Sequence, residues 1–130
     1  LWVSMELAGG IDVIDTRTLE VIDEIEFSPS GFRRSEVTPV EIKMAANGGR
    51  AYVALGRANR VAVVDVASRD VEKYILVGHR PWGLALNHDE TRLFVANGLS
   101  DDITVIDTKS LKAVKSIAVG SVPYAILIYD

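Results

Sequence analysis

The sequence predicts an all-β protein made of a repeated unit, because the same landmarks recur at a constant interval along the chain. Prolines that open an apolar run stand at Pro39, Pro81 and Pro123, which gives two equal intervals of 42. An aromatic residue followed by Val and Ala recurs at Tyr52 and Phe94, which are separated by the same interval. A fixed period of this size, composed of short apolar runs and turns, is typical of the blades of a β-propeller. We therefore expect about three four-stranded antiparallel blades that belong to a larger ring.

The individual strands are predicted from short runs that are rich in Val and Ile and bounded by Gly, Asn or Asp. The runs of the first unit are 1–5, 11–15 and 21–27. Those of the second unit are 40–45, 51–55, 60–65 and 71–77, and those of the third are 82–87, 93–97, 103–107 and 114–119. Residues 124–129 form one more opening run. We expect a single partial propeller domain over 1–130, with the second to fourth strands of one blade in 1–27, complete blades in 39–77 and 81–119, and an extra first strand in 123–130.

The hairpin order places the connections between strands on two faces of the ring. Links from a fourth strand to the next first strand share a face with links from a second strand to a third strand. That face should carry His79, Arg80 and Asp101. The first unit is eight residues longer than the others at this point, so we expect an insertion within 28–38 on the same face, near the axis. Long loops on a rigid scaffold often carry function, although a tolerated surface insertion gives the same pattern.

The composition is that of a globular protein, with 48% hydrophobic and 25% charged residues. The net charge is −4 and no basic run occurs, which argues against nucleic acid as the main partner. No apolar stretch approaches the length that a membrane-spanning helix needs. The chain begins at Leu1, inside an expected strand and without a signal peptide, so we expect that it continues a longer protein.

Several runs resemble the YVTN family of β-propeller repeats: 94–97, which reads FVAN, 103–108, which reads ITVIDT, and 117–120 with Pro123. This resemblance covers essentially the whole chain. Residues 77–86, which read VGHRPWGLAL, and 97–102, which read NGLSDD, are similar to the β-propeller proteins associated with pyrroloquinoline-quinone-dependent alcohol catabolism in bacteria. The resemblance implies a ring of about seven blades in a periplasmic or secreted protein. The first unit departs from the pattern, with Ser4 and Met5 where the motif has Thr-Asn.

The usual catalytic motifs do not occur in the sequence, so we assign no catalytic residue, no metal site and no cofactor from it. His79 and His88 are expected on opposite faces and cannot share a metal. Candidate ligand-binding residues are those expected on the loop-bearing face or at its strand ends: His79, Arg80, Trp82, Arg33, Arg34, Asn97, Asp101 and Asp102.

Each candidate also has a structural interpretation. His79 and Arg80 form either a binding loop near the axis or a solvated turn. Trp82 is either a core aromatic or a stacking platform at the channel mouth. Asp101 and Asp102 could suggest calcium, but two carboxylates are few for an ion that takes six to eight oxygens, and a strand-capping turn explains them as well. Arg33 and Arg34 could bind an anion or form a solvated pair.

The leading functional interpretation is a non-enzymatic binding scaffold, which by resemblance is periplasmic and accessory to quinoprotein alcohol oxidation. Its partner would be a protein of the quinoprotein dehydrogenase system, and open blade edges would also favour self-association. The first alternative is an enzyme or enzyme subunit of the lactonase or quinoprotein dehydrogenase heavy-chain type, with its site at the channel mouth. The second alternative is a surface-layer or adhesive repeat protein.

Overall fold

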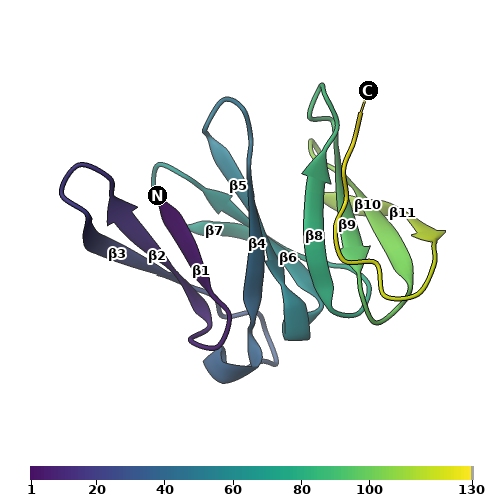
Figure 1. Ribbon diagram of the computed structural model, residues 1–130, viewed down its shortest axis with the longest axis horizontal. Coiled ribbons are helices and arrows are strands. Elements are labelled where there is room, and N and C mark those ends of the chain that lie inside the picture. The colour runs from purple at the N-terminus through teal and green to yellow at the C-terminus, as the bar shows by residue number, and fades with distance from the viewer. Residues whose placement is uncertain (130) are drawn as a thin grey trace.

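The computed structural model describes residues 1–129, which form three antiparallel sheets that stand side by side (Figure 1). The first sheet contains β1 (Trp2–Met5), β2 (Gly10–Asp15) and β3 (Glu20–Glu26). The second contains β4 (Pro39–Met44), β5 (Arg50–Leu55), β6 (Arg60–Asp65) and β7 (Val71–Leu76). The third contains β8 (Pro81–Leu86), β9 (Arg92–Asn97), β10 (Asp102–Asp107) and β11 (Lys112–Ala118). Within the described residues the helical segments are two short 3-10 turns, Arg34–Glu36 and Gly56–Ala58, so the all-β prediction is confirmed.

The repeat extends to the irregularities of the sheets. In all three sheets the register between the last two strands shifts at the same place, at Val13/Ile14, Val63/Val64 and Val105/Ile106. The turn between those strands ends each time in a residue with a left-handed backbone, Leu19, Arg69 or Leu111. Bulges of this kind increase the local twist of a strand pair. The three sheets therefore share one twisted shape, which lets them stack with their faces together.

An aspartate closes each of these turns. Asp15 accepts a hydrogen bond from the backbone N–H of Arg17 at 2.8 Å, and Asp65 accepts one from that of Ser68 at 2.8 Å. Asp107 is bound in the same way by Ser110 at 2.8 Å. These backbone hydrogen bonds lower the pKa of all three carboxyl groups, because they stabilise the charged form.

The middle sheet is buried on both faces, and this is where the core lies. On β5 and β6, residues such as Val53, Leu55 and Val64 face the first sheet and belong to one buried cluster. The alternate residues, among them Val61 and Val63, belong to a second cluster with the third sheet. Side chains on a strand alternate between faces, so a sheet packed on both sides needs consecutive apolar residues. The apolar run at 61–64 has this pattern.

The expected strand at 123–130 is the point where the structure departs from the prediction. Residues 123–129 do not form a strand, and Asp130 lies outside the described residues. The segment runs beside β8 (Figure 1), where the backbone of Tyr124 and Ala125 approaches Gly83. The segment therefore lies next to β8 in the position that β8 itself takes next to β4. Among the described residues no strand offers it a partner for backbone hydrogen bonds, and without such a partner an apolar run does not become a strand.

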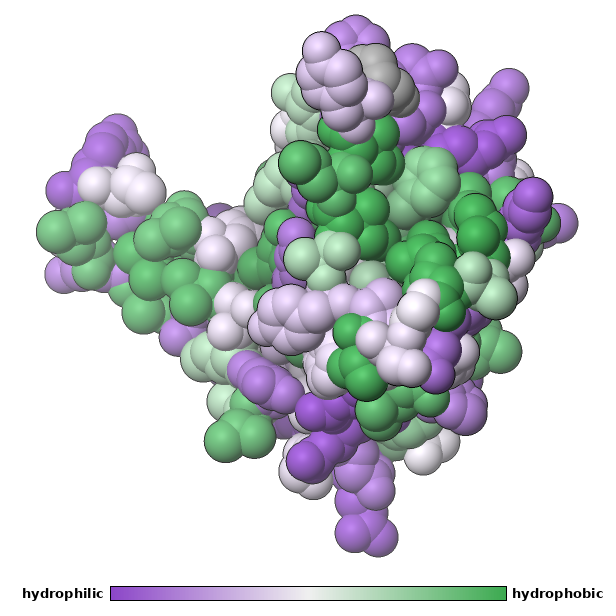
Figure 2. Space-filling view, turned by 45° about the vertical axis from the view of Figure 1, so that its right-hand side comes forward, coloured by the Kyte–Doolittle hydropathy of each residue, from purple (hydrophilic) through white to green (hydrophobic). Residues whose placement is uncertain are grey.

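Apolar surface gathers on the face of the molecule along which residues 123–129 run (Figure 2). Tyr124, Leu127 and Tyr129 are largely exposed there, and Val114 and Ile117 are exposed on β11. Exposed apolar patches of this kind often mark a surface that another element covers. The expectation of association through open blade edges stays a prediction.

Replacing Leu55 by Ala should destabilise the fold much more than the same change at Leu76. Leu55 is completely buried between two sheets, whereas Leu76 is 63% exposed at the end of β7. A buried Leu→Ala change costs about 2–5 kcal/mol through lost apolar burial and the cavity left behind. An exposed change costs about 0.5 kcal/mol or less. The urea midpoints of both variants give the comparison, and similar midpoints would show that the sheets do not pack as described.

Candidate functional site

The connections between strands divide the molecule into two ends that differ in character. The links β1–β2, β3–β4, β5–β6, β7–β8 and β9–β10 lie together at the lower end in Figure 1. We call this end the loop face and the opposite end, which carries the hairpin turns β2–β3, β4–β5, β6–β7, β8–β9 and β10–β11, the turn face. The inner strands β4 and β8 both begin at the loop face with a proline, so the residues after those prolines lie at the mouth of the expected channel.

Arg80 joins all three sheets at the loop face. Its backbone is left-handed, with a φ of 60°, and its N–H donates to the side-chain oxygen of Asn59 at 2.9 Å. Its guanidinium reaches Glu6 of the first sheet at 3.3 Å and lies 6.0 Å from the ring centre of Trp82. A cation over an aromatic ring is attracted by the electrons of the ring face. Arg80 is therefore held in a defined position with its charge still at the surface.

His79 lies beside Arg80, and its backbone is fixed while its side chain is exposed. Its N–H donates to the hydroxyl of Ser100 at 2.8 Å, and its carbonyl accepts from Leu99 at 3.0 Å. An open hollow of the loop face is lined by Arg57, Asn59, His79, Arg80 and Leu99. Two guanidinium groups and an imidazole thus line one hollow. Such a set can bind an anionic or oxygen-rich ligand, stabilise a developing negative charge and move a proton.

Trp82 is packed against neighbouring groups and is partly exposed, and its role as a stacking platform stays a prediction. One face of its ring lies on the backbone of Gly98, where a Cβ atom would come within 2.2 Å of the ring. The ring of Tyr124 lies 5.3 Å away at an angle of 53°, and the exposure of Trp82 is intermediate. Gly98 is required at this position because any side chain would displace the indole.

Asn97 and Asp102 form a polar network beside the hollow rather than in it. Asn97 is fully buried and donates to Asp102 at 3.2 Å and to the hydroxyl of Thr104 at 2.8 Å. Asp102 also accepts from Ser100 at 2.5 Å and from Ser116. Partial burial opposes the charged form of Asp102, but these donors outweigh it and lower the pKa of the carboxyl group. The network connects β9, β10 and β11 and, through Ser100, supports the backbone of His79.

Asp101 differs from its neighbour in that it is exposed and has a left-handed backbone, with a φ of 55°. Its carboxylate accepts the N–H of Val122 at 2.8 Å, so it caps the segment that follows β11.

Among residues 1–129, no three His, Asp or Glu side chains converge as ligands for a metal ion. In the same residues no helix has the length and hydropathy to cross a membrane.

The insertion lies on the loop face as expected, but its contacts are with outer strands rather than near the axis. Arg34 forms ion pairs with Glu24 and Glu26 on β3 and donates to the carbonyl of Ala8 at 2.9 Å. These charges draw the loop outward, toward the junction of the first and second sheets. Arg33 is exposed, and its backbone N–H donates to Glu36 at 2.7 Å. Neither Arg33 nor Arg34 is among the residues that line the hollow of His79 and Arg80.

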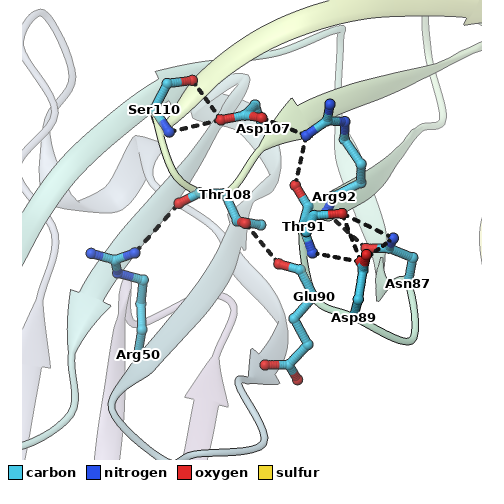
Figure 3. Close-up of polar contacts among 9 residues, drawn as sticks. All are labelled: Arg50, Asn87, Asp89, Glu90, Thr91, Arg92, Asp107, Thr108 and Ser110. Atoms are coloured by element: carbon cyan, nitrogen blue, oxygen red, sulfur yellow. Dashed lines mark hydrogen bonds and ion pairs between the residues drawn. The ribbon is translucent and has the colours of Figure 1, made fainter.

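A second hollow on the turn face has its polar groups already engaged. Arg50 donates to Glu72 at 2.9 Å and to the carbonyl of Thr108 in the third sheet at 3.5 Å. Glu90 accepts the N–H of Ala46 at 2.8 Å. Figure 3 shows that the neighbouring groups are also engaged with one another, including the contacts among Asn87, Asp89, Thr91, Arg92, Asp107 and Ser110. The contacts of Arg50 with Thr108 and of Glu90 with Ala46 join the second and third sheets, so we interpret this hollow as a structural junction.

The ligand-binding candidates chosen from the sequence did not include Arg57, Asn59, Glu6 or Glu41, which the structure places at the loop face. A signal was present for two of them. Asn59 stands exactly one repeat before Asp101 and shares its left-handed backbone. Glu41 stands one repeat before Gly83, so a charged side chain occupies a position that is small in the next unit.

The comparisons with known proteins agree with this architecture. The family model described as "Lactonase, 7-bladed beta-propeller" matches residues 1–123. No curated protein matches the chain. Among solved structures, a hydrazine synthase of Kuenenia stuttgartiensis has a TM-score of 0.84 and 26% identity over 95% of this chain and 34% of its own. The periplasmic gluconolactonase PpgL of Pseudomonas aeruginosa has a TM-score of 0.75 and 26% identity over 92% of this chain and 37% of its own.

A third solved structure, U3-55K, has a TM-score of 0.73 at 14% identity over 90% of this chain and 35% of its own, and this supports the fold alone. The chain spans about a third of the length of the solved structures that it matches. The β-propeller prediction is confirmed by these matches. The narrower YVTN and quinone-associated resemblances stay predictions.

Replacing Asp102 by Asn should destabilise the protein in a pH-dependent way. The pKa of Asp102 is lowered in the folded state, so its contribution is complete above its ordinary value of 3.8 and is lost as the pH falls through the folded-state pKa. We expect a loss of about 1–2 kcal/mol at pH 7, from hydrogen bonds to a charged group. The difference from the unmodified protein should shrink below pH 3.8. Urea unfolding at pH 7 and pH 3 measures this, and an equal difference at both pH values would contradict it.

Replacing Gly98 by Ala should displace the indole of Trp82. The added Cβ would lie 2.2 Å from the ring, and the backbone φ of Gly98 is not in the left-handed region, so the cost is steric. Overpacking of this kind costs about 1–3 kcal/mol. A shift in tryptophan fluorescence together with a lower unfolding midpoint is expected. Gly120→Ala is the control, because a Cβ there meets no atom within 4 Å; equal effects of the two changes would contradict the packing.

Proposed function

Because this chain belongs to the family of seven-bladed β-propeller lactonases, we propose that it supplies part of the substrate-binding mouth of a propeller that hydrolyses lactones. The observation that carries the proposal is the convergence of Arg57, His79 and Arg80 on one open hollow of the loop face. The gluconolactonase among the structural matches supports the same reaction class.

Hydrolysis of a lactone needs a positioned water, a proton acceptor and stabilisation of negative charge. Water attacks the carbonyl carbon, the carbonyl oxygen becomes negative in the tetrahedral intermediate, and the bond to the ring oxygen then breaks to give a hydroxy acid. In the proposed mechanism His79 takes the proton from the attacking water and returns it to the departing ring oxygen. Arg57 and Arg80 stabilise the negative oxygen, a role that fixed cationic donors fill well.

The contacts of Arg80 support its part in this mechanism. An effective electrostatic group must be in place before the reaction, because reorganisation during the reaction raises the barrier. The backbone of Arg80 is held by Asn59 at 2.9 Å, and its guanidinium is held by Glu6 at 3.3 Å. His79 is positioned through its backbone contacts with Ser100 and Leu99, which leave the imidazole able to meet a ligand.

We extend the proposal to a periplasmic location, which the periplasmic PpgL supports. The interpretation as a non-enzymatic scaffold for quinoprotein alcohol oxidation, with a protein partner, draws no support from the family match. The surface-layer interpretation stays a prediction. A turnover assay distinguishes the lactonase proposal from these two interpretations, because only a lactonase must convert substrate into product.

The test is hydrolysis of D-glucono-δ-lactone by the purified protein that contains this chain, corrected for the uncatalysed rate. His79→Gln should lower kcat/KM about 100-fold, in the range that general acid–base groups contribute. Arg57→Gln should also lower it, by up to about 100-fold, because one of the groups that stabilise the negative oxygen is lost. The matched controls lie on the turn face: His88→Gln for the histidine, and Arg17→Gln, whose side chain is 89% exposed, for the arginine. Both controls should stay within twofold of the unmodified protein.

Two results would contradict the proposal. One is a rate no higher than the uncatalysed rate. The other is equal activity in the loop-face variants and their turn-face controls. Thermal unfolding of all four variants shows whether a loss of activity comes from a loss of structure.

A further inference from the structure

A third hollow lies at the channel mouth, beside Arg80. It is formed by three consecutive inner segments: Val40 and Glu41 on β4, Trp82 on β8, and Tyr124 with Ala125 on the segment that follows β11. The guanidinium of Arg80, which lines the first hollow, lies 6.0 Å from the ring centre of Trp82, which lines this one. A ligand bound by Arg80 could therefore extend along Trp82 toward the inner strands.

Glu41 is the one carboxylate that β4 and β8 contain. Its Oε2 accepts the backbone N–H of Leu84 on the neighbouring inner strand at 2.8 Å. Within the described residues its other oxygen has no hydrogen-bond partner. The residues at the same place in the repeat are Gly83 and Ala125, which have no polar side chain. Glu41 is therefore fixed in direction by one oxygen and can accept hydrogen bonds from a ligand with the other.

The rest of this hollow is aromatic. The rings of Trp82 and Tyr124 are 5.3 Å apart and tilted by 53°, and both line the hollow. An ionised carboxylate accepts hydrogen bonds only, and charge-assisted hydrogen bonds are stronger than neutral ones. The C–H face of a saturated ring packs on an aromatic face, and its hydroxyl groups point sideways. A carboxylate beside two aromatic rings is thus suited to a ring that carries several hydroxyl groups.

We propose that Glu41 is a specificity-determining residue, which accepts hydrogen bonds from the hydroxyl groups of a polyhydroxylated ligand whose ring packs on Trp82 and Tyr124. The inference rests on the proposed lactonase function, which it refines. The reacting carbonyl lies toward Arg80 and His79, and the hydroxylated part of the molecule lies toward Glu41. An unsubstituted lactone makes the first set of contacts and not the second.

The experiment compares two lactones in the protein that contains this chain: D-glucono-δ-lactone, which carries hydroxyl groups, and δ-valerolactone, which carries none. Glu41→Gln keeps the shape of the side chain and an oxygen that can accept the N–H of Leu84. It should raise KM for D-glucono-δ-lactone about 10- to 100-fold, since a hydrogen bond to a charged group is lost. The values for δ-valerolactone should stay within twofold.

Glu90→Gln is the matched control, because Glu90 also accepts a backbone N–H across two sheets, that of Ala46 at 2.8 Å, but does so on the turn face. It should leave both lactones unaffected. A second measurement needs no turnover. By calorimetry, D-gluconate should bind the unmodified protein and bind Glu41→Gln about tenfold or more weakly, whereas 5-hydroxypentanoate should bind both proteins alike.

The outcomes separate this inference from the proposed function. The inference is supported if Glu41→Gln weakens binding and raises KM for the hydroxylated compounds alone. Equal loss with both lactones, or no change with either, overturns it and leaves Glu41 as a structural contact of Leu84. If the unmodified protein hydrolyses no lactone but binds D-gluconate through Glu41, the lactonase function fails and the specificity role stands. Absence of D-gluconate binding overturns the specificity role even where δ-valerolactone is hydrolysed.

Discussion

The constraint on which the rest of this structure depends is that a sheet must bury both of its faces against its neighbours. β5 and β6 send alternate side chains into two separate buried clusters, one on each side of the middle sheet. The sheets can stack in this way only if they share the same twist. The register shifts that recur at Val13, Val63 and Val105 give them that common shape. The stacking in turn directs every second-to-third and fourth-to-first connection to one end of the molecule, so the loop face follows from the packing.

The two faces use the same types of residue for different purposes. On the turn face, Asp107 is held by Ser110 and Arg92, and Arg50 donates to Thr108 (Figure 3). Arg50 is also paired with Glu72. On the loop face, polar contacts hold backbone atoms of His79 and Arg80, and the guanidinium of Arg80 is paired with Glu6. The side chains of His79 and Arg57 remain exposed there. Polar groups that bind one another stabilise a junction, whereas polar groups that are positioned but accessible can bind a ligand. This difference is the reason for placing the candidate site on the loop face.

The sequence predicted the fold well because the fold depends on periodicity, which is visible in one chain. The constant repeat placed the strands and the loop face. The tail at 123–129 was predicted as a strand because its apolar pattern matches the repeat, yet a strand also needs a partner, which the pattern does not show. The contacts of Arg34 were missed for a related reason: its partners Glu24 and Glu26 lie on β3, and sequence spacing does not show where a long loop folds. Arg57 and Glu41 escaped notice because each occurs in one repeat only, and a search for recurring residues passes over them.

The central claim is that a lactone-derived ligand binds at the loop-face mouth of the propeller. A crystal structure of the protein that contains this chain, grown with D-gluconate, tests it most directly. The account predicts the ligand between Arg57, His79 and Arg80, with its hydroxylated part along Trp82. Binding in the hollow lined by Arg50 and Glu72 on the turn face, or a loop face empty at saturating D-gluconate, would contradict it.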